Sequence, residues 1–193
     1  MSRALDDLPR IEIRSRADLR AFLAAHHATA GSHWLVTFRK PSPDHVPHPA
    51  IVEELLCWGW IDSLPRGLDA GRTMLLISPR KDGSAWSAVN RAHAERAIAS
   101  GAMTPAGLAR IAAAKASGMW SFLDDVERLE LPADLAAAFT PDARAVWDGF
   151  PKSVRRGALE WLKTAKGAGT RAARVAGIAD SAARGLRPAP FRR

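Results

Sequence analysis

The stretch from Glu53 to Asn90 decides the fold of this chain. It begins Glu-Glu-Leu-Leu-Cys-Trp-Gly-Trp-Ile-Asp at residues 53–62, continues as Pro-Arg-Lys at 79–81, and ends as Ser-Ala-Trp-Ser-Ala-Val-Asn at 84–90. Its first part has the apolar spacing of a helix that stops at a glycine, and two apolar runs flank a polar turn. The stretch therefore predicts a helix, two strands and the start of a second helix, with three tryptophans among them.

The segments on both sides extend this pattern. Upstream, residues 11–13 and 34–38 have the composition of strands, and Ser15 is the expected N-cap of a helix between them. Downstream of Ser84 the sequence is helical in pattern, with Ser, Thr or Pro at helix starts and Gly at helix ends. This order predicts an α+β fold, in which a small, mostly antiparallel sheet is covered by helices and is followed by an α-helical C-terminal region.

We expect two regions along the chain. Residues 1–120 should form an α+β domain with a tryptophan-rich core, and residues 121–193 a basic helical region. Packing of both regions as one unit is left open by the sequence.

Three local details follow from the turn and cap signals. A polar turn holding Pro65, Gly67 and Gly71 should separate the two strands of the deciding stretch. Ser153 should open a long helix, and the glycines at 167 and 169 should break it. Thr170 should then cap the last helix.

The positive charge is concentrated at the C-terminal end. The chain has a net charge of +8, and its last 43 residues hold eleven Lys and Arg against Glu160 and Asp180, a net of +9. Residues 1–150 are close to neutral, so an electrostatic partner is expected at residues 151–193.

Hydropathy and cysteine usage indicate the compartment. No window approaches the ~18 uninterrupted apolar residues of a membrane span, and the N-terminal residues lack a secretory apolar segment. A single cysteine, Cys57, excludes an intramolecular disulfide and suits a reducing environment. These features predict a cytoplasmic protein without a membrane span, and they leave its oligomeric state open.

Several motifs carry a resemblance to a known family. They are the deciding stretch itself, a Gly-x-Met-x-Pro-x-Gly motif at 101–107, and Trp-x-x-x-Ala-Lys-x-x-x-Thr-Arg-x-x-Arg at 161–174. In this order, over roughly residues 33–178, the chain resembles the YdeI/OmpD-associated family of bacteriocin-protection proteins. The resemblance implies a role in tolerance of bacteriocins or antimicrobial peptides and implies no established catalytic chemistry. One departure is Gly169, where the family usually has Glu.

The deciding stretch also holds the first candidate ligand site. Arg80 precedes a helix start, and helix N-termini bind anions through free amides and partial positive charge. The candidate residues for a small anionic ligand are Trp58, Trp60, Asp62, Arg80, Lys81, Trp86 and Asn90. Two alternatives stay open: the tryptophans are simply core residues, and Arg80 pairs with Asp62 or Asp69 at the sheet edge.

A second candidate anion site lies in the basic region. Its residues are Lys166, Thr170, Arg171 and Arg174, which should converge on the start of the last helix. The glycines around it do not have the order of a phosphate-binding loop, and a helix rather than a strand precedes them. The alternative interpretation is a helix C-cap followed by a hinge.

Other chemically capable residues give weaker signals. Cys57 has no neighbouring base and is expected to be inert packing, and His45 and His48 are too few for a zinc site. Glu53 and Glu54 are expected to be exposed or capping. We therefore expect no catalytic residues, no metal site and no cofactor.

The sequence favours a non-catalytic cytoplasmic binding protein of the YdeI/OmpD-associated type that contributes to stress tolerance and binds a small anion. The alternative is weak binding of nucleic acid or another anionic surface through residues 151–193, although no stacking platform accompanies the basic residues. An enzyme is the less favoured class, because no catalytic motif is found.

Overall fold

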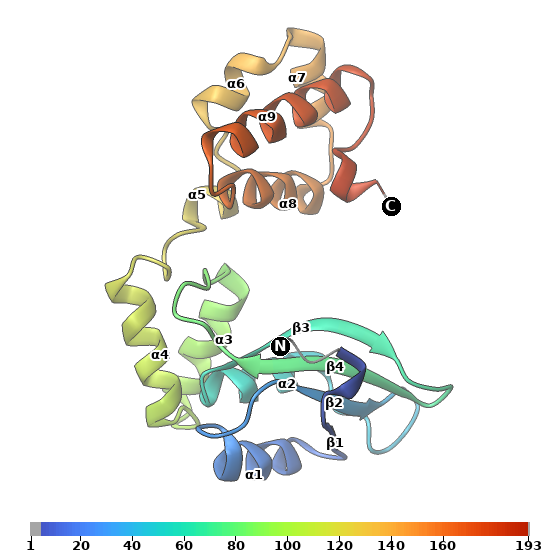
Figure 1. Ribbon diagram of the computed structural model, residues 1–193, viewed down its shortest axis with the longest axis vertical. Coiled ribbons are helices and arrows are strands. Elements are labelled where there is room, and N and C mark those ends of the chain that lie inside the picture. The colour runs from blue at the N-terminus through green and yellow to red at the C-terminus, as the bar shows by residue number, and fades with distance from the viewer. Residues whose placement is uncertain (1–4, 193) are drawn as a thin grey trace. The chain divides into compact units, whose positions relative to one another are not determined.

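A computed structural model describes residues 5–192 of the chain, which divides into two compact units. The N-terminal unit extends to Phe122 and the helical unit begins at Leu123. Figure 1 shows the sheet and its helices in the first unit and helices alone in the second. The α+β fold class is confirmed. That residues 1–120 and 121–193 are separate domains stays a prediction.

The N-terminal unit is built on one sheet. Its elements in chain order are η1 (Leu5–Asp7), β1 (Arg10–Glu12), α1 (Arg16–His26), β2 (His33–Phe38), α2 (His48–Cys57), β3 (Trp60–Gly67), β4 (Arg72–Pro79), α3 (Ala88–Ala99) and α4 (Pro105–Ala116). The strand order is β1-β2-β4-β3, with β1 parallel to β2 and the other pairs antiparallel. The sheet is therefore mostly antiparallel, as the sequence predicts.

Alternation along the strands gives the sheet two apolar faces. Leu35 of β2 lies opposite Leu75 of β4, and both belong to the core cluster that holds Leu19 of α1 and Leu55 of α2. Their neighbours along the strands point the other way and build a second cluster of Trp34, Val36 and Met74. The first face is the one that α1 and α2 cover.

Helix α4 docks on the end of α2 through the Gly-x-Met-x-Pro-x-Gly motif. Thr104, the N-cap of α4, donates its hydroxyl to the Cys57 carbonyl at 2.6 Å. A Cβ at Gly107 would lie 2.4 Å from that same carbonyl oxygen. Only glycine allows this approach, so the motif joins a helix start to a helix end in the interior.

Strand β3 is longer than its sequence suggests. Pro65 and Gly67 lie inside β3 and not in the turn, and pairing with β4 shifts register between Asp62 and Pro65. The turn prediction is right for Gly71, which lies between the strands, and wrong for Pro65 and Gly67, because β3 is an edge strand, where a proline lacking its N–H and a bulge are both tolerated.

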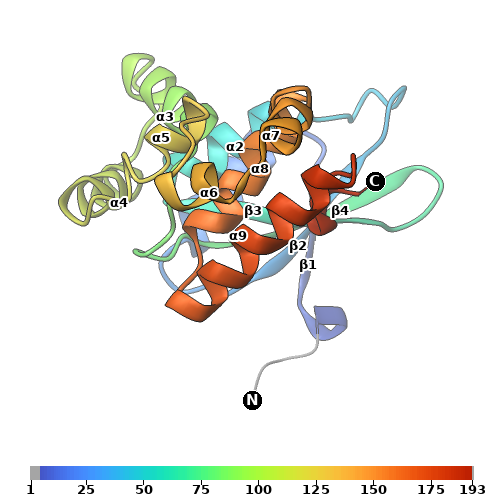
Figure 2. The same cartoon turned by 90° about the horizontal axis from the view of Figure 1, so that it is seen from above.

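The helical unit consists of short helices around one long one. Its elements are α5 (Asp124–Glu127), α6 (Ala133–Ala138), α7 (Pro141–Asp148), α8 (Lys152–Lys163), α9 (Ala168–Ala183) and η2 (Ala189–Phe191). Helix α9 packs against α6, α7 and α8, and Figure 2 shows it as the long helix of this unit. Its buried face includes Ile178 and Ala182.

Two helix starts differ from the sequence prediction. Helix α8 begins at Lys152 with Pro151 as its N-cap, so Ser153 lies inside the helix. Helix α9 begins at Ala168 after Gly167, and Thr170 lies in its first turn without capping it. Gly169 does not break the helix, because a glycine there costs only about 1 kcal/mol relative to alanine.

Candidate functional site

Arg80 is held where β4 ends and the approach to α3 begins. Its backbone N–H donates to the Gly59 carbonyl at 2.9 Å, which fixes the chain beside the end of α2. Its guanidinium carbon lies 4.1 Å from the centroid of the Trp86 ring, and Nη2 donates to the Ala85 carbonyl at 2.5 Å. A weaker contact of 3.4 Å reaches the Ser84 carbonyl. The side chain is thus stacked and tethered, with 3% of the residue exposed.

The charge of Arg80 has no opposite charge beside it. Within residues 5–192 no carboxylate pairs with it, and its buried Nε has no hydrogen-bond partner. Burial alone lowers its pKa to about 10. The alternative pairing is wrong, because Asp62 binds His48 and Asp69 binds Arg72. A buried cation without a counter-ion is unfavourable, so an anion at this point would stabilise it.

A cleft of about 600 Å³ lies next to Arg80. Its lining residues are Gly31, Ser32, Ser78, Pro79, Arg80, Lys81, Asp82 and Arg110. Arg110 of α4 pairs with Asp82, and Lys81 has no acidic partner among the described residues. Three cations against one carboxylate leave the cleft positive, and the serine hydroxyls add uncharged donors. This set suits a small oxyanion.

Sequence reasoning missed part of this cleft. Arg110 lies thirty residues after Arg80, and only the docking of α4 on α2 brings the two together. The sequence offers no signal for Arg110, and only the structure shows that its side chain lies against Gly59, which has a positive φ of 71°.

The three tryptophans of the deciding stretch do not gather at one point. Trp60 is buried in the cluster under the sheet, where its Nε1 donates to the His27 carbonyl. Trp86 belongs to a different cluster, beside Trp120, with ring centroids 5.0 Å apart. Trp58 is half-buried and donates to Glu54. Only Trp86 therefore contacts Arg80, and it does so as a platform beneath the cation.

The remaining candidates of this stretch also separate. Asp62 lies on β3 and accepts from His48 Nε2 at 2.8 Å. Asn90 lies in the first turn of α3, where its backbone N–H donates to the Ser87 hydroxyl at 3.2 Å. Neither residue lines the cleft. Arg80, Lys81 and Trp86 are the members that the fold brings together.

Comparison with known protein families finds one match in each unit. Residues 11–110 match the family described as a domain of unknown function, DUF8412, over just over half of the chain. The chain belongs to the DUF8412 family. Residues 128–185 match the family described as "Bacteriocin-protection, YdeI or OmpD-Associated". This confirms the resemblance over residues 128–185, whereas the deciding stretch lies in the DUF8412 match.

The motifs that carried the resemblance fall in different family matches. The deciding stretch and the Arg80 cleft fall within the DUF8412 match, and the Trp-x-x-x-Ala-Lys motif falls within the second match. Searches of curated proteins and of solved structures returned no match to the chain. The site must therefore be understood from its own geometry.

The two arginines among the anion candidates of the helical unit have internal partners. Arg171 forms two hydrogen bonds with Asp134, at 2.6 and 2.9 Å, and these chiefly raise its pKa. Arg174 donates to the Trp161 carbonyl and stacks on the Trp161 ring at 4.8 Å. Lys166 and Thr170 are exposed and add no built pocket. Position 169 is Gly, and Arg171 has its acidic partner in Asp134.

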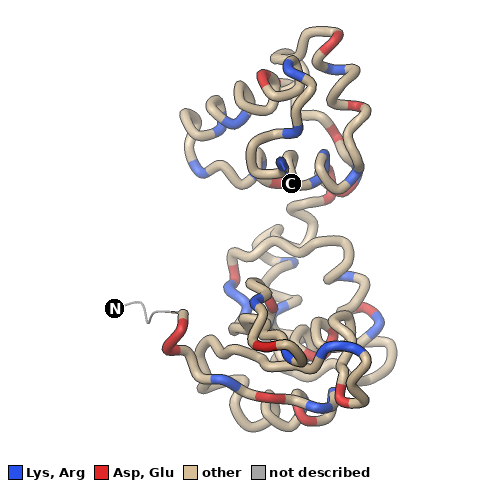
Figure 3. The backbone as a smooth tube through the Cα atoms, turned by 90° about the vertical axis from the view of Figure 1, so that its right-hand side faces the viewer, with Lys and Arg blue, Asp and Glu red and all other residues tan. Residues whose placement is uncertain are grey.

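Acids from the first half of the helical unit neutralise bases from the second half. Arg156 binds Glu127 at 2.8 Å and Glu160 at 2.7 Å, and Lys163 binds Asp125 at 2.6 Å. Figure 3 shows basic and acidic segments interleaved along this unit. Over residues 123–193 the net charge is only +4, less than half of the +9 counted from residue 151.

The remaining chemically capable residues are structural. Cys57 is buried, and desolvation raises its thiol pKa to about 11, which opposes nucleophilic use. Glu54 is 1% exposed and binds Arg16 and Arg20 at 2.7 and 2.8 Å. The expectation that Glu54 is exposed or capping is wrong, because ion pairs with these two arginines of α1 stabilise its carboxylate in the interior.

Residues 5–192 contain neither a metal-binding cluster nor a membrane-spanning helix. Within that range, no group of three or more His, Cys, Asp and Glu side chains could hold a metal ion. In the same range, no helix combines the length and the apolar character needed to cross a bilayer.

Proposed function

We propose that this protein is a non-catalytic cytoplasmic binding protein that holds a small phosphate-bearing ligand in the cleft beside Arg80, and that it contributes in this way to tolerance of bacteriocins or antimicrobial peptides. The observation that carries the binding proposal is the buried Arg80 guanidinium without a carboxylate. The link to tolerance is supported by the YdeI/OmpD-associated match of residues 128–185.

The choice of phosphate rests on the number and type of donors. Arg80 and Lys81 supply positive charge without an acidic partner in the described part of the chain, and Ser32 and Ser78 supply hydroxyls, whereas the charge of Arg110 is already paired with Asp82. A phosphate group has more acceptor oxygens than a carboxylate and can use several donors at once. Asp82 is already bound to Arg110, which reduces its repulsion of an incoming anion.

Titration calorimetry of the full chain with inorganic phosphate tests the binding proposal. We expect heat that Arg80→Met abolishes and that Lys81→Gln weakens several-fold, since each removes one charge from the cleft. The matched control is Lys152→Gln, an exposed lysine of the helical unit, which should bind as the wild type does. Equal binding by Lys81→Gln and the wild type would overturn the proposal, and this variant changes only an exposed side chain.

A cell assay tests the link to tolerance. In a strain that lacks its own copy, the wild-type chain should restore growth in the presence of an antimicrobial peptide. Arg80→Met should not restore it, at equal protein level. Full restoration by Arg80→Met would remove the cleft from the tolerance role.

The second candidate function is weak nucleic-acid or anionic-surface binding by residues 151–193. The exposed lysines Lys152 and Lys166 favour it, because neither has an acidic partner among the described residues. The internal pairing of Arg156, Lys163 and Arg171 makes it the weaker candidate. It predicts affinity for duplex DNA that falls steeply with salt.

A further inference from the structure

A second cavity lies in the N-terminal unit, away from the Arg80 cleft. It has a volume of about 330 Å³, at the lower end of the range of small-molecule sites, roughly 300–1,000 Å³. None of its lining residues lines the Arg80 cleft. No family description or motif assigns it a role.

The cavity lies where the sheet extends beyond the first turn of α2. The paired strand residues Thr37 and Thr73 lie on the same sheet face as Leu75, the face that α1 and α2 cover. Helix α2 starts only at His48, so its first turn stops short of this end of the sheet. Residues 39–47 pass over the gap as a loop instead of filling it.

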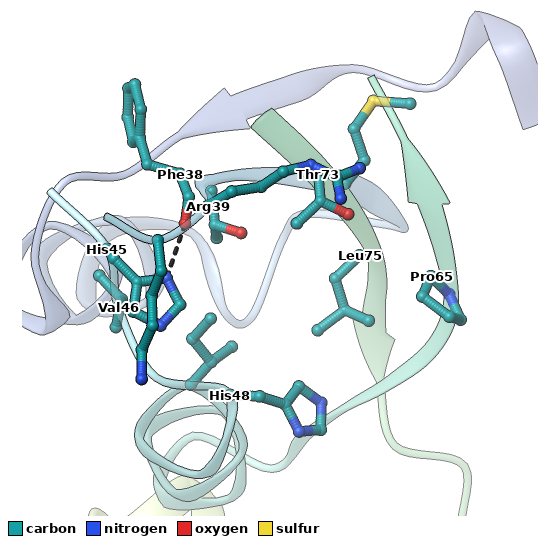
Figure 4. Close-up of a pocket in the computed structure, with 12 residues that line it drawn as sticks. Phe38, Arg39, His45, Val46, His48, Pro65, Thr73 and Leu75 are labelled. Atoms are coloured by element: carbon teal, nitrogen blue, oxygen red, sulfur yellow. Dashed lines mark hydrogen bonds between the residues drawn. The ribbon is translucent and has the colours of Figure 1, made fainter. Parts of the chain in front are cut away.

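The loop is fixed in place on one side of the cavity. His45 Nδ1 donates to the Phe38 carbonyl at 2.7 Å, and Figure 4 shows this bond with Val46 beside it. Pro65 and Leu75 lie on the opposite side, and His48 stands at the foot of the cavity. Val46 and Leu75 are 6% and 8% exposed, so the interior is a built apolar wall.

The charge at the rim has one sign. Arg39 and Lys40 line the cavity, and no acidic residue does. Figure 4 shows the Arg39 side chain reaching across toward Thr73. Lys40 is exposed and has no acidic partner among the described residues. Two nearby acids are outside the lining: Asp62 accepts a hydrogen bond from His48, and Asp44 of the loop pairs with Arg14.

We propose that this cavity binds a small monocarboxylate with an apolar body, whose tail lies against Val46, Ile51 and Leu75 and whose carboxylate meets Arg39 and Lys40. An inorganic anion would leave the apolar wall uncovered, and a neutral apolar molecule would leave the cationic rim unused. The proposal is independent of phosphate binding at Arg80, because the two sites share no residue.

Calorimetric titration of the full chain with octanoate, octanol and inorganic phosphate tests the proposal. Octanoate should bind at least tenfold more tightly than octanol, and phosphate should not displace it. Methyl NMR shifts on adding octanoate should be largest at Val46, Ile51 and Leu75. Octanol binding as tightly as octanoate, or shifts centred elsewhere, would overturn the proposal.

Variants separate this site from the Arg80 cleft. Lys40→Gln should weaken octanoate binding about five- to tenfold and leave phosphate binding unchanged, and Lys81→Gln should do the reverse. Val46→Phe should abolish octanoate binding by filling the cavity. If Val46→Phe fails to fold, the exposed Lys40 variant still decides. Wild-type octanoate affinity in Lys40→Gln contradicts the proposal whatever the phosphate result.

Discussion

Arg80 of the N-terminal unit and Arg156 of the helical unit have opposite electrostatic surroundings. Arg80 is the more deeply buried, and among the described residues it has a tryptophan face and backbone carbonyls but no carboxylate. Arg156 is bound on three nitrogens by Glu127 and Glu160. Although each unit has a net charge of +4, the N-terminal unit holds a buried cation without a carboxylate partner in its described residues, whereas several bases of residues 151–193 are paired with acids of their own unit.

This difference shows how net charge misleads as a guide to a binding site. Counted along the chain, residues 151–193 dominate the positive charge. Counted in space, several of those bases are committed to acids of residues 124–134. A committed base offers little to a partner, because binding must first replace an existing ion pair. An uncompensated buried cation offers more.

The largest effect on stability is expected when a buried carboxylate that has arginine partners is neutralised. Glu54→Gln should lower the free energy of unfolding of the N-terminal unit by about 2 to 3 kcal/mol, because it breaks the pairs with Arg16 and Arg20 in the interior. Hydrogen exchange read peptide by peptide reports this unit separately from the helical one. The exposed carboxylate of Glu95 is the control, and Glu95→Gln should change stability by less than about 0.5 kcal/mol.

The next largest loss of stability is expected when Arg156 is replaced, and the same replacement at Arg80 gives a direct comparison. Arg156→Met removes the two hydrogen bonds that Arg156 donates to Glu127, whose side chain is 20% exposed, and should cost about 1 to 2 kcal/mol in the helical unit. Arg80→Met strands no carboxylate and relieves the burial of a charge, so it should cost its own unit less than Arg156→Met costs the helical one. Hydrogen exchange of the two variants measures both costs. A larger loss in Arg80→Met would mean that Arg80 is a structural anchor first.

How far the sequence predicts the fold depends on whether the signal is local. Ser15 caps its helix as predicted, and Thr104 and Thr140 are threonines that cap the helices beginning after them, in line with the helix-start pattern of the sequence. Such caps are decided within one turn of chain. Pro65 in β3 was not predictable in the same way, because its tolerance depends on β3 being an edge strand.

The candidate sites show the same division more strongly. Arg80 and Lys81 could be singled out because they precede a helix start. Arg110 could not, since it reaches the cleft only through the docking of α4 at Gly107. The pairing of Arg171 with Asp134 was equally hidden, because it joins two helices across 37 residues of sequence.

Acid should weaken the internal pairing of the helical unit. The hydrogen bonds from Arg171 lower the pKa of Asp134 below its usual value, so the folded state binds a proton there less readily than the unfolded state. This contribution to stability is present above about pH 4 and is lost as pH falls through the lowered pKa. Since Asp134 is 43% exposed, we expect the loss to stay below about 1 kcal/mol.

Denaturant unfolding of the helical unit between about pH 6 and pH 3 measures this loss, with hydrogen exchange as the probe. Asp134→Asn should flatten part of the pH dependence, because it removes the titrating group. An unchanged slope in Asp134→Asn would show that the Arg171 pair adds nothing to stability.

The smallest effect is expected for nucleic acid. Only exposed bases such as Lys152 and Lys166 remain for phosphate contacts, so duplex DNA should bind weakly at low salt and lose most of that affinity at physiological salt. Lys152→Gln and Lys166→Gln should each weaken low-salt binding about two- to threefold and reduce the salt slope by up to about one unit. Fluorescence anisotropy with a labelled duplex measures both quantities, and Lys115→Gln in the N-terminal unit is the control. If Lys115→Gln weakens binding as much, or if no binding occurs at low salt, then residues 151–193 are not a nucleic-acid surface. In that case even the lysines of the helical unit that have no acidic partner among the described residues do not bind nucleic acid.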